Sequence, residues 1–403
     1  MLGFALLNIV RQARRSFTAV LAIAFGITAL ILASGFIEWN LWYGRESTIH
    51  SQLGHVRVFK PGYLKSGLAD PFAYLLPDDA SQKTLIESVP QVRSLAPRLA
   101  FNGLISHGES TISFIGEGVD AEREQALSRS LTIVEGESLS PQDPKGIIVG
   151  QGLAANLGVK PGNTIVLLVN TPSGGVNAVE GRVRGLFATI TKAYDDSALR
   201  VPIAMARQLL RVSGSHTYVL LLDKTEHTDE AIAKLRELFR DKPLEFVPWT
   251  QMADFYNKTA DLFSRQVSVV RLIIALIIML SISNSLMMSV MERTRDIGTM
   301  MALGTKRASV LGLFVAEGAL LGVFGGLIGL AVGWLAAMAI SAIGIPMPAP
   351  PGAAFGYTAE IMVTWPMALQ GFALAILTTL VASLYPAWKA SRMEIVNALR
   401  HNR

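Results

Sequence analysis

Four long apolar stretches dominate the pattern of hydrophobic and polar positions along the chain. They cover residues 17–37, 272–290, 310–340 and 367–387. A helix needs about 20 mainly apolar residues to cross a bilayer, because the hydrocarbon core is about 30 Å thick and a helix rises 1.5 Å per residue. Each stretch is long enough, so the pattern predicts an α-helical membrane protein with four transmembrane helices.

The first apolar stretch could also be the core of a secretory signal peptide. It follows Arg11, Arg14 and Arg15, as such a core would. However, its 21 residues exceed the usual length of a signal-peptide core, and no A-x-A-like cleavage site follows it. We therefore expect a retained anchor, with residues 1–38 forming the N-terminus and the first crossing.

The long segment between the first two apolar stretches has the pattern of a folded domain. Short alternating runs bounded by Gly and Pro predict strands near residues 55–59, 104–105, 111–117, 146–149, 164–169, 183–186 and 217–222. Helical periodicity marks residues 122–128, 205–212 and 229–239. We expect a large inserted α+β domain over residues 39–249, with two subdomains, one of them inserted at roughly 119–215. Trp39, Trp42 and Tyr43 at its start are typical of a membrane surface.

An apolar stripe runs through residues 250–291 and into the second crossing, which predicts one continuous helix. Phe255, Phe263 and Val267 lie on this stripe. A helix over these 42 positions would span about 63 Å, of which only about 30 Å fits in hydrocarbon. We expect the remainder to stand outside the membrane as a stalk, with Arg271 at the outer interface, where its side chain reaches water.

The third apolar stretch contains 31 residues, more than one untilted crossing needs, and it includes Glu317. If the crossing begins at Ala319, Glu317 lies at the membrane surface and residues 310–318 form an interfacial elbow. Six glycines follow two lines of i, i+4 spacing, and small-residue lines of this kind let helices approach closely in lipid. The lines are Gly318, Gly322 and Gly326, and Gly325, Gly329 and Gly333.

The distribution of Lys and Arg in the short flanking segments predicts the orientation. Residues 1–16 carry three Arg and no acid, whereas residues 292–309 and the tail 389–403 carry four Lys or Arg each. The loop 341–366 carries neither Lys nor Arg. We therefore expect both termini and the loop 292–309 in the cytoplasm, and the inserted domain and the loop 341–366 outside.

Composition narrows the functional classes. The 403 residues are 51% hydrophobic and 17% charged, which fits a membrane protein with a large soluble part. The net charge of +5 follows from the inward bias of Lys and Arg, and no basic stretch interleaved with aromatic residues suggests nucleic-acid binding. Zero cysteines exclude disulfides and thiolate metal sites. The usual nucleotide, hydrolase and zinc-protease motifs are missing, so we expect no enzymatic site, metal or cofactor in this chain.

The segment 291–307 is the most informative one. Its charges come first, among them Glu292, Arg293 and Arg295. Ile297, Met300, Met301 and Leu303 then form a short apolar ridge, and Gly304 closes a turn. The segment could be a basic loop that rests on lipid headgroups. It could equally be a short helix that inserts into a groove of a partner, because Met-rich ridges suit adaptable contacts. The residue chemistry leaves both readings open.

Several motifs resemble a known permease family. They are E-R-T-R-D-I-G-T-M-M-A-L-G-T at 292–305, F-V-A-E-G at 314–318, the tail Y-P-A-W-K-A-S-R-M-E-I-V-N-A-L-R at 385–400, and, in the inserted domain, G-E-G-V-D at 116–120, I-V-G at 148–150, L-A-A-N-L-G-V-K-P-G at 153–162 and Y-D-D at 194–196. Together they are similar to the FtsX-like and MacB-like ABC transporter permeases, which include MacB, LolC, LolE and FtsX. The resemblance extends over nearly the whole chain.

The resemblance implies a transmembrane subunit that borrows its ATPase from a separate chain, which would bind ATP and Mg. It also implies a pair of permeases, identical or different, and a coupling role for Glu292, Arg293, Arg295, Gly298, Leu303 and Gly304. In such proteins ATPase motion passes through the membrane to the outer domain, a process called mechanotransmission. The expected localisation is the bacterial inner membrane, and the printed sequence contains no ATPase domain of the kind fused to MacB.

Three functions remain open. The first is extraction of lipid or lipoprotein, or export across the envelope, with membrane lipid and a periplasmic adaptor or lipoprotein carrier as further partners. The second is FtsX-like signalling that activates a periplasmic cell-wall hydrolase, although the FtsX outer domain is much smaller. The third is a passive anchored receptor, which the coupling segment argues against.

Overall fold

The computed structural model describes residues 2–11, 13–67, 69–127, 131–189, 191–349 and 356–394. The expected outer loop therefore lies outside the described residues at 350–355, as does the tail from residue 395 onward. The chain divides into two compact units. The first consists of residues 1–42, 259–346 and 358–403, and the second of residues 43–258 and 347–357. We call the first the helical unit and the second the outer domain.

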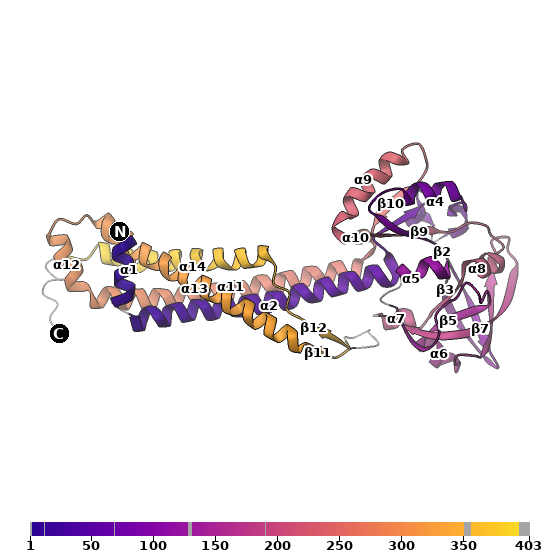
Figure 1. Cartoon of the computed structure of the whole chain (residues 1–403), viewed down its shortest axis with the longest axis horizontal. Coiled ribbons are helices and arrows are strands. Elements are labelled where there is room, and N and C mark those ends of the chain that lie inside the picture. Colours follow the sequence, from indigo (N-terminus) through magenta and orange to yellow (C-terminus); the bar gives the residue numbers. More distant parts are fainter. Residues whose placement is uncertain are drawn as a thin grey trace. The chain divides into compact units, whose positions relative to one another are not determined.

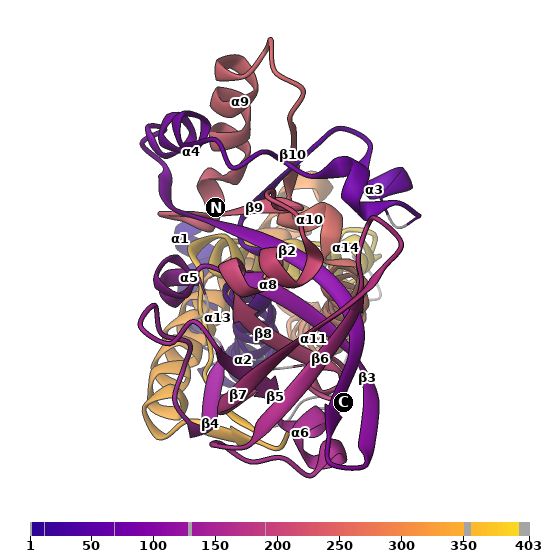
Figure 2. The same cartoon turned by 90° about the vertical axis from the view of Figure 1, so that its right-hand side faces the viewer.

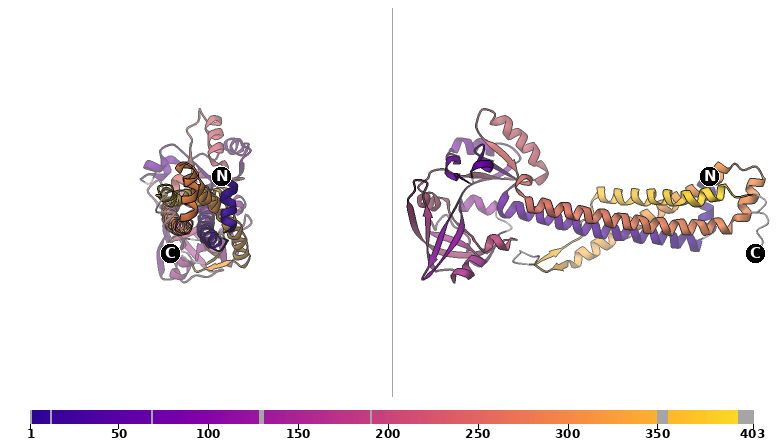
Figure 3. Two further views of the ribbon diagram at one scale, coloured as in Figure 1. Left: turned by 90° about the vertical axis from the view of Figure 1, so that its left-hand side faces the viewer. Right: turned by 180° about the vertical axis from the view of Figure 1, so that it is seen from behind.

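The helical unit is built from long helices that lie side by side (Figures 1 and 3). Its helices are α1 (Leu2–Arg11), α2 (Ala13–Thr48), α11 (Asp254–Glu292), α12 (Thr294–Ala302), α13 (Arg307–Ile343) and α14 (Trp365–Ser391), and α2 and α11 also contribute residues to the outer domain. Within the described residues, four helices are long and apolar enough to cross a membrane: α2 with the turn that follows it, α11, α13 and α14. The prediction of four apolar helices is thus confirmed.

Two details of the predicted helices differ from the structure. The expected helix over residues 250–291 is two helices, because Ala253 breaks the chain between α10 (Trp249–Met252) and α11. Phe255 does not belong to a buried stripe, since 84% of its surface is exposed. Residues 310–318, where an interfacial elbow was expected, belong to α13, which runs as one helix from Arg307 to Ile343.

The outer domain contains one mixed sheet (Figure 2). Its strands are β1 (Val56–Phe59), β2 (Val92–His107), β3 (Ser110–Val119), β4 (Thr132–Gly136), β5 (Gly146–Gly150), β6 (Thr164–Asn170), β7 (Val176–Ala188), β8 (Ala198–Pro202), β9 (Thr217–Leu222) and β10 (Glu245–Pro248). The order is β10-β1-β9-β2-β3-β8-β5-β7-β4, and β6 pairs with β2 and β7. The pairs β3–β8 and β5–β7 are parallel and the other pairs are antiparallel. The prediction of an α+β domain is confirmed.

Helices cover this sheet and connect its strands. They are α3 (Tyr63–Ser66), α4 (Ala80–Glu87), α5 (Ala121–Leu127), α6 (Gln151–Leu157), α7 (Lys192–Asp195), α8 (Ile203–Leu210), α9 (Thr228–Leu238) and α10, with 3-10 turns at Pro71–Tyr74 and Thr225–His227. A further pair of short strands, β11 (Ile345–Met347) and β12 (Tyr357–Ala359), forms a separate small sheet.

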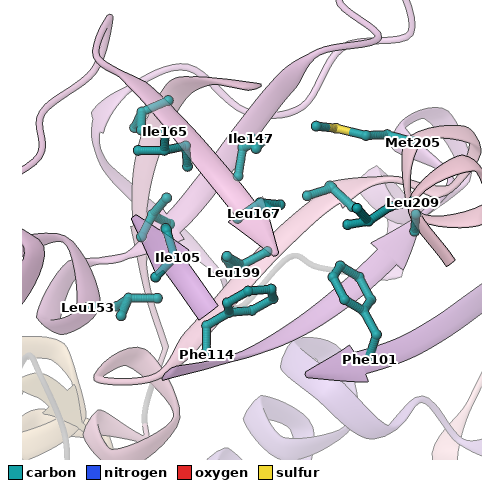
Figure 4. Packing of buried hydrophobic residues seen from close by; sticks show 14 of the residues in the cluster. Phe101, Ile105, Phe114, Ile147, Leu153, Ile165, Leu167, Leu199, Met205 and Leu209 are labelled. Atoms are coloured by element: carbon teal, nitrogen blue, oxygen red, sulfur yellow. The ribbon is translucent and has the colours of Figure 1, made fainter. Parts of the chain in front are cut away.

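Two hydrophobic clusters hold the domain together. The first packs α6 and α8 against β2, β3 and β5 to β8, with Phe101, Phe114 and Leu199 among its buried residues (Figure 4). Its buried members come from residues 99–210. The second packs α4 and α9 against β1, β9, β10 and the start of β2, and its buried members come from residues 56–95 and 218–246. Only β2 contributes to both clusters, because it is long enough to run past both.

Candidate coupling site

The helix α12 occupies the turn between the second and third long helices, where the coupling segment was predicted. A single residue, Arg293, separates the end of α11 from the start of α12. At its other end α12 stops in a Schellman motif: the Thr305 N–H donates to the Met300 carbonyl at 3.0 Å and the Gly304 N–H to the Met301 carbonyl at 3.1 Å. Gly304 has φ 94°, which a glycine adopts without strain. The segment is therefore a helix with defined ends.

The four residues of the predicted apolar ridge do not share one exposed face, which corrects that expectation. Ile297 and Met301 are only 1% and 8% exposed, because they pack against Val290 of α11, Phe314 of α13 and Ala387 of α14. Met300 is half-buried against the same cluster. Leu303 alone is open, with 84% of its surface exposed. The apolar ridge thus serves mainly to dock α12 on its own bundle.

The outward face of α12 has a different composition from the one expected. It carries Arg295, Asp296, Thr299, Ala302 and Leu303, all exposed. Gly298 is buried on the inner side, and Glu292 is exposed at the junction with α11. A partner would therefore meet charges at the start of the helix, small side chains in the middle and one leucine at the end.

A buried ion pair holds the junction between α11 and α12. Arg293 Nη1 lies 3.4 Å from Glu317 Oε1, and the two side chains are 13% and 4% exposed. Arg293 also donates from Nη2 to the Asn8 carbonyl of α1 at 3.4 Å. Glu317 is therefore the buried charged partner of Arg293 at this junction. The sequence offered one signal of this role: a lone carboxylate inside an apolar helix is costly unless it is paired.

A second, more open pair lies at the same junction. Arg15 at the start of α2 contacts Glu292 at the end of α11, and these side chains are 33% and 46% exposed. Solvent screens this ion pair, so it contributes less to stability than the buried pair does. The start of α2, the end of α11 and α13 are nevertheless all tied to the residues that flank α12.

The six glycines of α13 serve two different neighbours. A Cβ on Gly318, Gly322 or Gly326 would meet Ser383, Thr379 or Phe372 of α14 at 2.2–2.9 Å. A Cβ on Gly325, Gly329 or Gly333 would meet residues 23–31 of α2 at 2.6–3.1 Å. Real Cβ atoms rarely come closer than 3.0 Å to such neighbours. Each line therefore creates one close helix contact, and α13 is held between α2 and α14.

A cavity of about 660 Å³ lies among α2, α11 and α14, toward the end of the bundle opposite α12. Its wall mixes apolar side chains such as Ile37 and Val267 with the charged Glu38 and Arg271. Arg271 Nη2 donates to Gln370 Oε1 at 3.1 Å. The arginine thus lines a cavity between helices, which the sequence did not indicate. Phe263 is half-buried one turn above Val267 on α11.

Two family models match the chain. The MacB-like periplasmic core domain matches residues 16–238, which is more than half of the 403 residues. The FtsX-like permease C-terminal model matches residues 268–395. The second match contains α12, the junction residue Arg293 and Glu317.

Relatives and solved structures are similar over large parts of the chain. An uncharacterized ABC transporter permease of Methanocaldococcus jannaschii is 24% identical, over 98% of this chain and 96% of that one. The lipoprotein-releasing system transmembrane protein LolC of Xylella fastidiosa is 24% identical, over 96% and 94%. The periplasmic region of MacB from Actinobacillus actinomycetemcomitans is 12% identical, with a TM-score of 0.37, over 53% of this chain and 95% of that one.

The four apolar helices, the mixed-sheet domain inserted after the first of them and both family matches agree with one another. The chain therefore belongs to the FtsX-like, MacB-type family of ABC transporter permeases, which are inner-membrane proteins.

Proposed function

We propose that this permease transmits motion from a separate ABC ATPase through the membrane to its outer domain. The observation that carries the proposal is the docking of α12: its inner face is buried in the bundle, and its outer face is exposed among the described residues. A passive anchor has no need of a short helix fixed to three longer ones. In this proposal the partner ATPase binds ATP and Mg, and the permease acts with a second copy, identical or different.

The proposed orientation places both termini and α12 in the cytoplasm and the outer domain in the periplasm. The distribution of Lys and Arg supports it, because positively charged short segments stay inside. On this orientation Arg15, Arg293 and Arg295 lie near the cytoplasmic surface.

The length of α11 supports a mechanical role. Its 39 residues span about 58 Å, roughly twice the thickness of the hydrocarbon core. A helix of this kind acts as a lever, because its backbone hydrogen bonds resist bending along the whole length. We further propose that the two hydrophobic clusters mark two subdomains of the outer domain, each with its own core.

The proposed substrate class is a lipid or a lipid-linked molecule. The cavity among α2, α11 and α14 supports this class, since Ile37, Leu41 and Val267 offer apolar surface while Glu38 and Arg271 offer charge. A molecule with acyl chains and a polar head matches such a wall. The family resemblance adds lipoprotein release and export as the two candidate processes.

The alternative is a signalling permease whose outer domain activates a periplasmic enzyme. The α12 docking would serve it equally well, but a cavity between helices has no purpose in that function. Loss of transport without loss of partner activation would distinguish the two.

Substituting Phe263 by Pro is expected to uncouple the outer domain from ATP hydrolysis. A proline inside a helix costs about 3 kcal/mol and kinks it, so a lever would no longer transmit an axial displacement. Transport is expected to fall more than tenfold in proteoliposomes that contain the ATPase, while hydrolysis and membrane insertion persist. Phe263→Ala is the matched control, because it removes the same ring without breaking the helix. Normal transport by the proline variant would rule out a lever.

Single cysteines test the proposed orientation, because the chain has no cysteine of its own. Ser173 and Thr299 are both exposed, the first in the outer domain and the second on α12. In intact spheroplasts an impermeant maleimide is expected to label Ser173→Cys, and Thr299→Cys only after the membrane is opened. Labelling in the reverse order would overturn the orientation while leaving the fold unaffected.

A further inference from the structure

The first long helix ends inside the outer domain. A π-helical turn, η1 (Ile49–Leu53), follows α2 directly, and Gly54 with φ 67° ends it. Every helix end leaves its last carbonyls without partners in the helix, and a buried end must find partners elsewhere. Single π-turns of this kind frequently occur at functional sites.

Three arginines supply those partners. Arg200 Nη2 donates to the Ser51 carbonyl at 2.9 Å, and Arg98 Nη1 to the Gln52 carbonyl at 2.5 Å. Arg57 forks across two carbonyls, from Nη2 to Gln52 at 2.7 Å and from Nε to Leu53 at 3.2 Å. The negative end of the helix dipole favours positive charge at this position.

Two glutamates, the buried Glu124 and the half-buried Glu117, offset two of the three positive charges of this cluster. Arg98 binds Glu124 of α5 with two nitrogens, at 2.5 and 3.3 Å, and Arg200 binds it at 3.2 Å. Arg200 Nε also lies 3.2 Å from Glu117 of β3. Arg98, Arg200 and Glu124 are at most 6% exposed. Losing one partner would leave an uncompensated buried charge, so the cluster holds together as a unit.

The surroundings of the arginines shift the pKa of Glu117 and of Tyr194 in opposite directions. Burial would by itself raise the pKa of Glu117, but Arg98, Arg200 and Arg57 together with a hydrogen bond from Tyr194 lower it to about 2. Burial and the negative charge of Glu117 raise the pKa of Tyr194 to about 12. Glu117 is therefore ionised and the Tyr194 hydroxyl protonated near neutral pH.

The arginines come from strands on both sides of the domain. Arg57 lies on β1, beside the second hydrophobic cluster, and Arg200 lies on β8, beside the first. Arg98 lies on β2, the strand that serves both. The helix end is thus tied at one point to both halves of the sheet.

The other long helix enters the domain differently. Ala253, with φ −93° and ψ 51°, separates α10 from α11, and this break packs against η1 through Trp249 and Ile49. Ile49, Trp249 and Ala253 are the buried members of that apolar cluster, and the Trp249 N–H donates to the His55 carbonyl at 3.0 Å. The one-residue break between α10 and α11 permits the angle between these helices to change. The end of η1 does not permit such a change, because three arginines hold its last carbonyls.

We propose that Arg57, Arg98 and Arg200 form a clamp that fixes the end of α2 to both halves of the outer domain, so that displacement of α2 moves them together. These are positioning residues that act through the helix end. The clamp concerns α2, and its role in transport rests on the proposed function.

Conservative substitutions to lysine test the clamp in the full-length permease in nanodiscs. Arg57→Lys is the sharpest, because the hydrogen bonds it removes all go to carbonyls of η1. Arg200→Lys removes the bond to Ser51 while keeping a positive charge beside both glutamates. Arg184→Lys is the matched control, since Arg184 also joins a carbonyl, that of Ser138, to carboxylates, but far along the chain from η1.

Hydrogen exchange of the amides at residues 49–54 is the first readout. We expect exchange about tenfold or more faster in the Arg57 and Arg200 variants, the factor that loss of one charge-assisted hydrogen bond produces. Exchange in β9 should stay unchanged, as should both regions in the Arg184 control. Unchanged exchange at 49–54 in both clamp variants would overturn the clamp. If Arg200→Lys unfolds the domain, hydrogen exchange in β9 will also become faster. In that case the Arg57→Lys variant alone tests the clamp.

Transport per ATP hydrolysed is the second readout. In the clamp variants we expect it to fall at least fivefold while ATP hydrolysis continues, and in the Arg184 control to remain at the wild-type level. Faster exchange with normal transport per ATP would show that the arginines only stabilise the helix end, and would refute their positioning role. If the wild-type protein shows no ATP-linked transport, the proposed function is wrong. The hydrogen-exchange measurement then tests by itself whether the arginines fix the helix end.

Discussion

Substituting Leu303 by Asp is expected to abolish copurification of the permease with its ATPase while the permease still inserts and folds. Leu303 is 84% exposed, so little of its surface is covered by the described residues of its own chain. If it fills an apolar groove on the ATPase, the new carboxylate is desolvated without a partner, which costs several kcal/mol. That cost lowers affinity by about a hundredfold or more.

The contrast with Ile297 makes this experiment specific. Ile297→Asp places the same charge in the cluster formed by α11, α12, α13 and α14, where only 1% of the native side chain is exposed. We expect this second variant to lower the thermal stability of the permease itself. Met300 is a poor choice, because it is half-buried and its substitution would mix both effects.

Copurification in mild detergent, thermal unfolding of the permease alone and substrate-stimulated ATP hydrolysis are the three measurements. The Leu303 variant should lose the first and third and keep the second. Full retention of the ATPase by this variant would mean that α12 does not present Leu303 to a partner groove, and the proposed mechanism would then rest on family membership alone.

Replacing Glu317 by Ala is expected to destabilise the permease by about 3–5 kcal/mol, because it leaves the guanidinium of Arg293 buried without its charged partner. The loss should appear as a lower unfolding temperature in detergent. It should also release α12 from its docked position, so that Thr299→Cys in the same background reacts faster with a maleimide.

Two controls separate the buried pair from a general effect of charge. Glu292→Ala removes the partner of Arg15, an ion pair that is 33% and 46% exposed, and solvent screening limits its effect to about 1 kcal/mol or less. Replacing Arg293 by Met together with Glu317 by Leu removes both buried charges and is expected to restore most of the stability. Equal destabilisation by Glu292→Ala and Glu317→Ala would contradict the importance of burial.

The sequence alone predicted much of the architecture for clear physical reasons. Apolar stretches of about 20 residues or more have few structures available to them other than a membrane helix, so the four apolar helices were confirmed. Alternation and Gly or Pro punctuation likewise located most strands of the outer domain, because the side-chain period of a strand is local. The coupling segment, residues 291–307, was recognisable from its charges. A short helix was one of the two interpretations of this segment, and a basic loop was the other.

Tertiary contacts decided where the stalk helix begins and which face of α12 is exposed. Periodicity predicts one helix from residue 250 onward, but the chain breaks at Ala253 between α10 and α11, where Trp249 and Ala253 pack against Ile49. Ile297 and Leu303 look equivalent in the sequence, yet one is buried and the other exposed, because α13 and α14 cover only one side of α12.

The charged pairs could not be predicted from the sequence, for a related reason. Arg293 and Glu317 are 24 positions apart, Arg15 and Glu292 are 277 apart, and Ser51 and Arg200 are 149 apart. No local period links such positions, since only the folded path of the chain brings them together. Sequence by itself therefore determined the four long apolar helices and most strands of the outer domain, because their patterns are local. The tertiary structure alone decided which buried charges meet, because burial and pairing depend on neighbours that are distant along the chain.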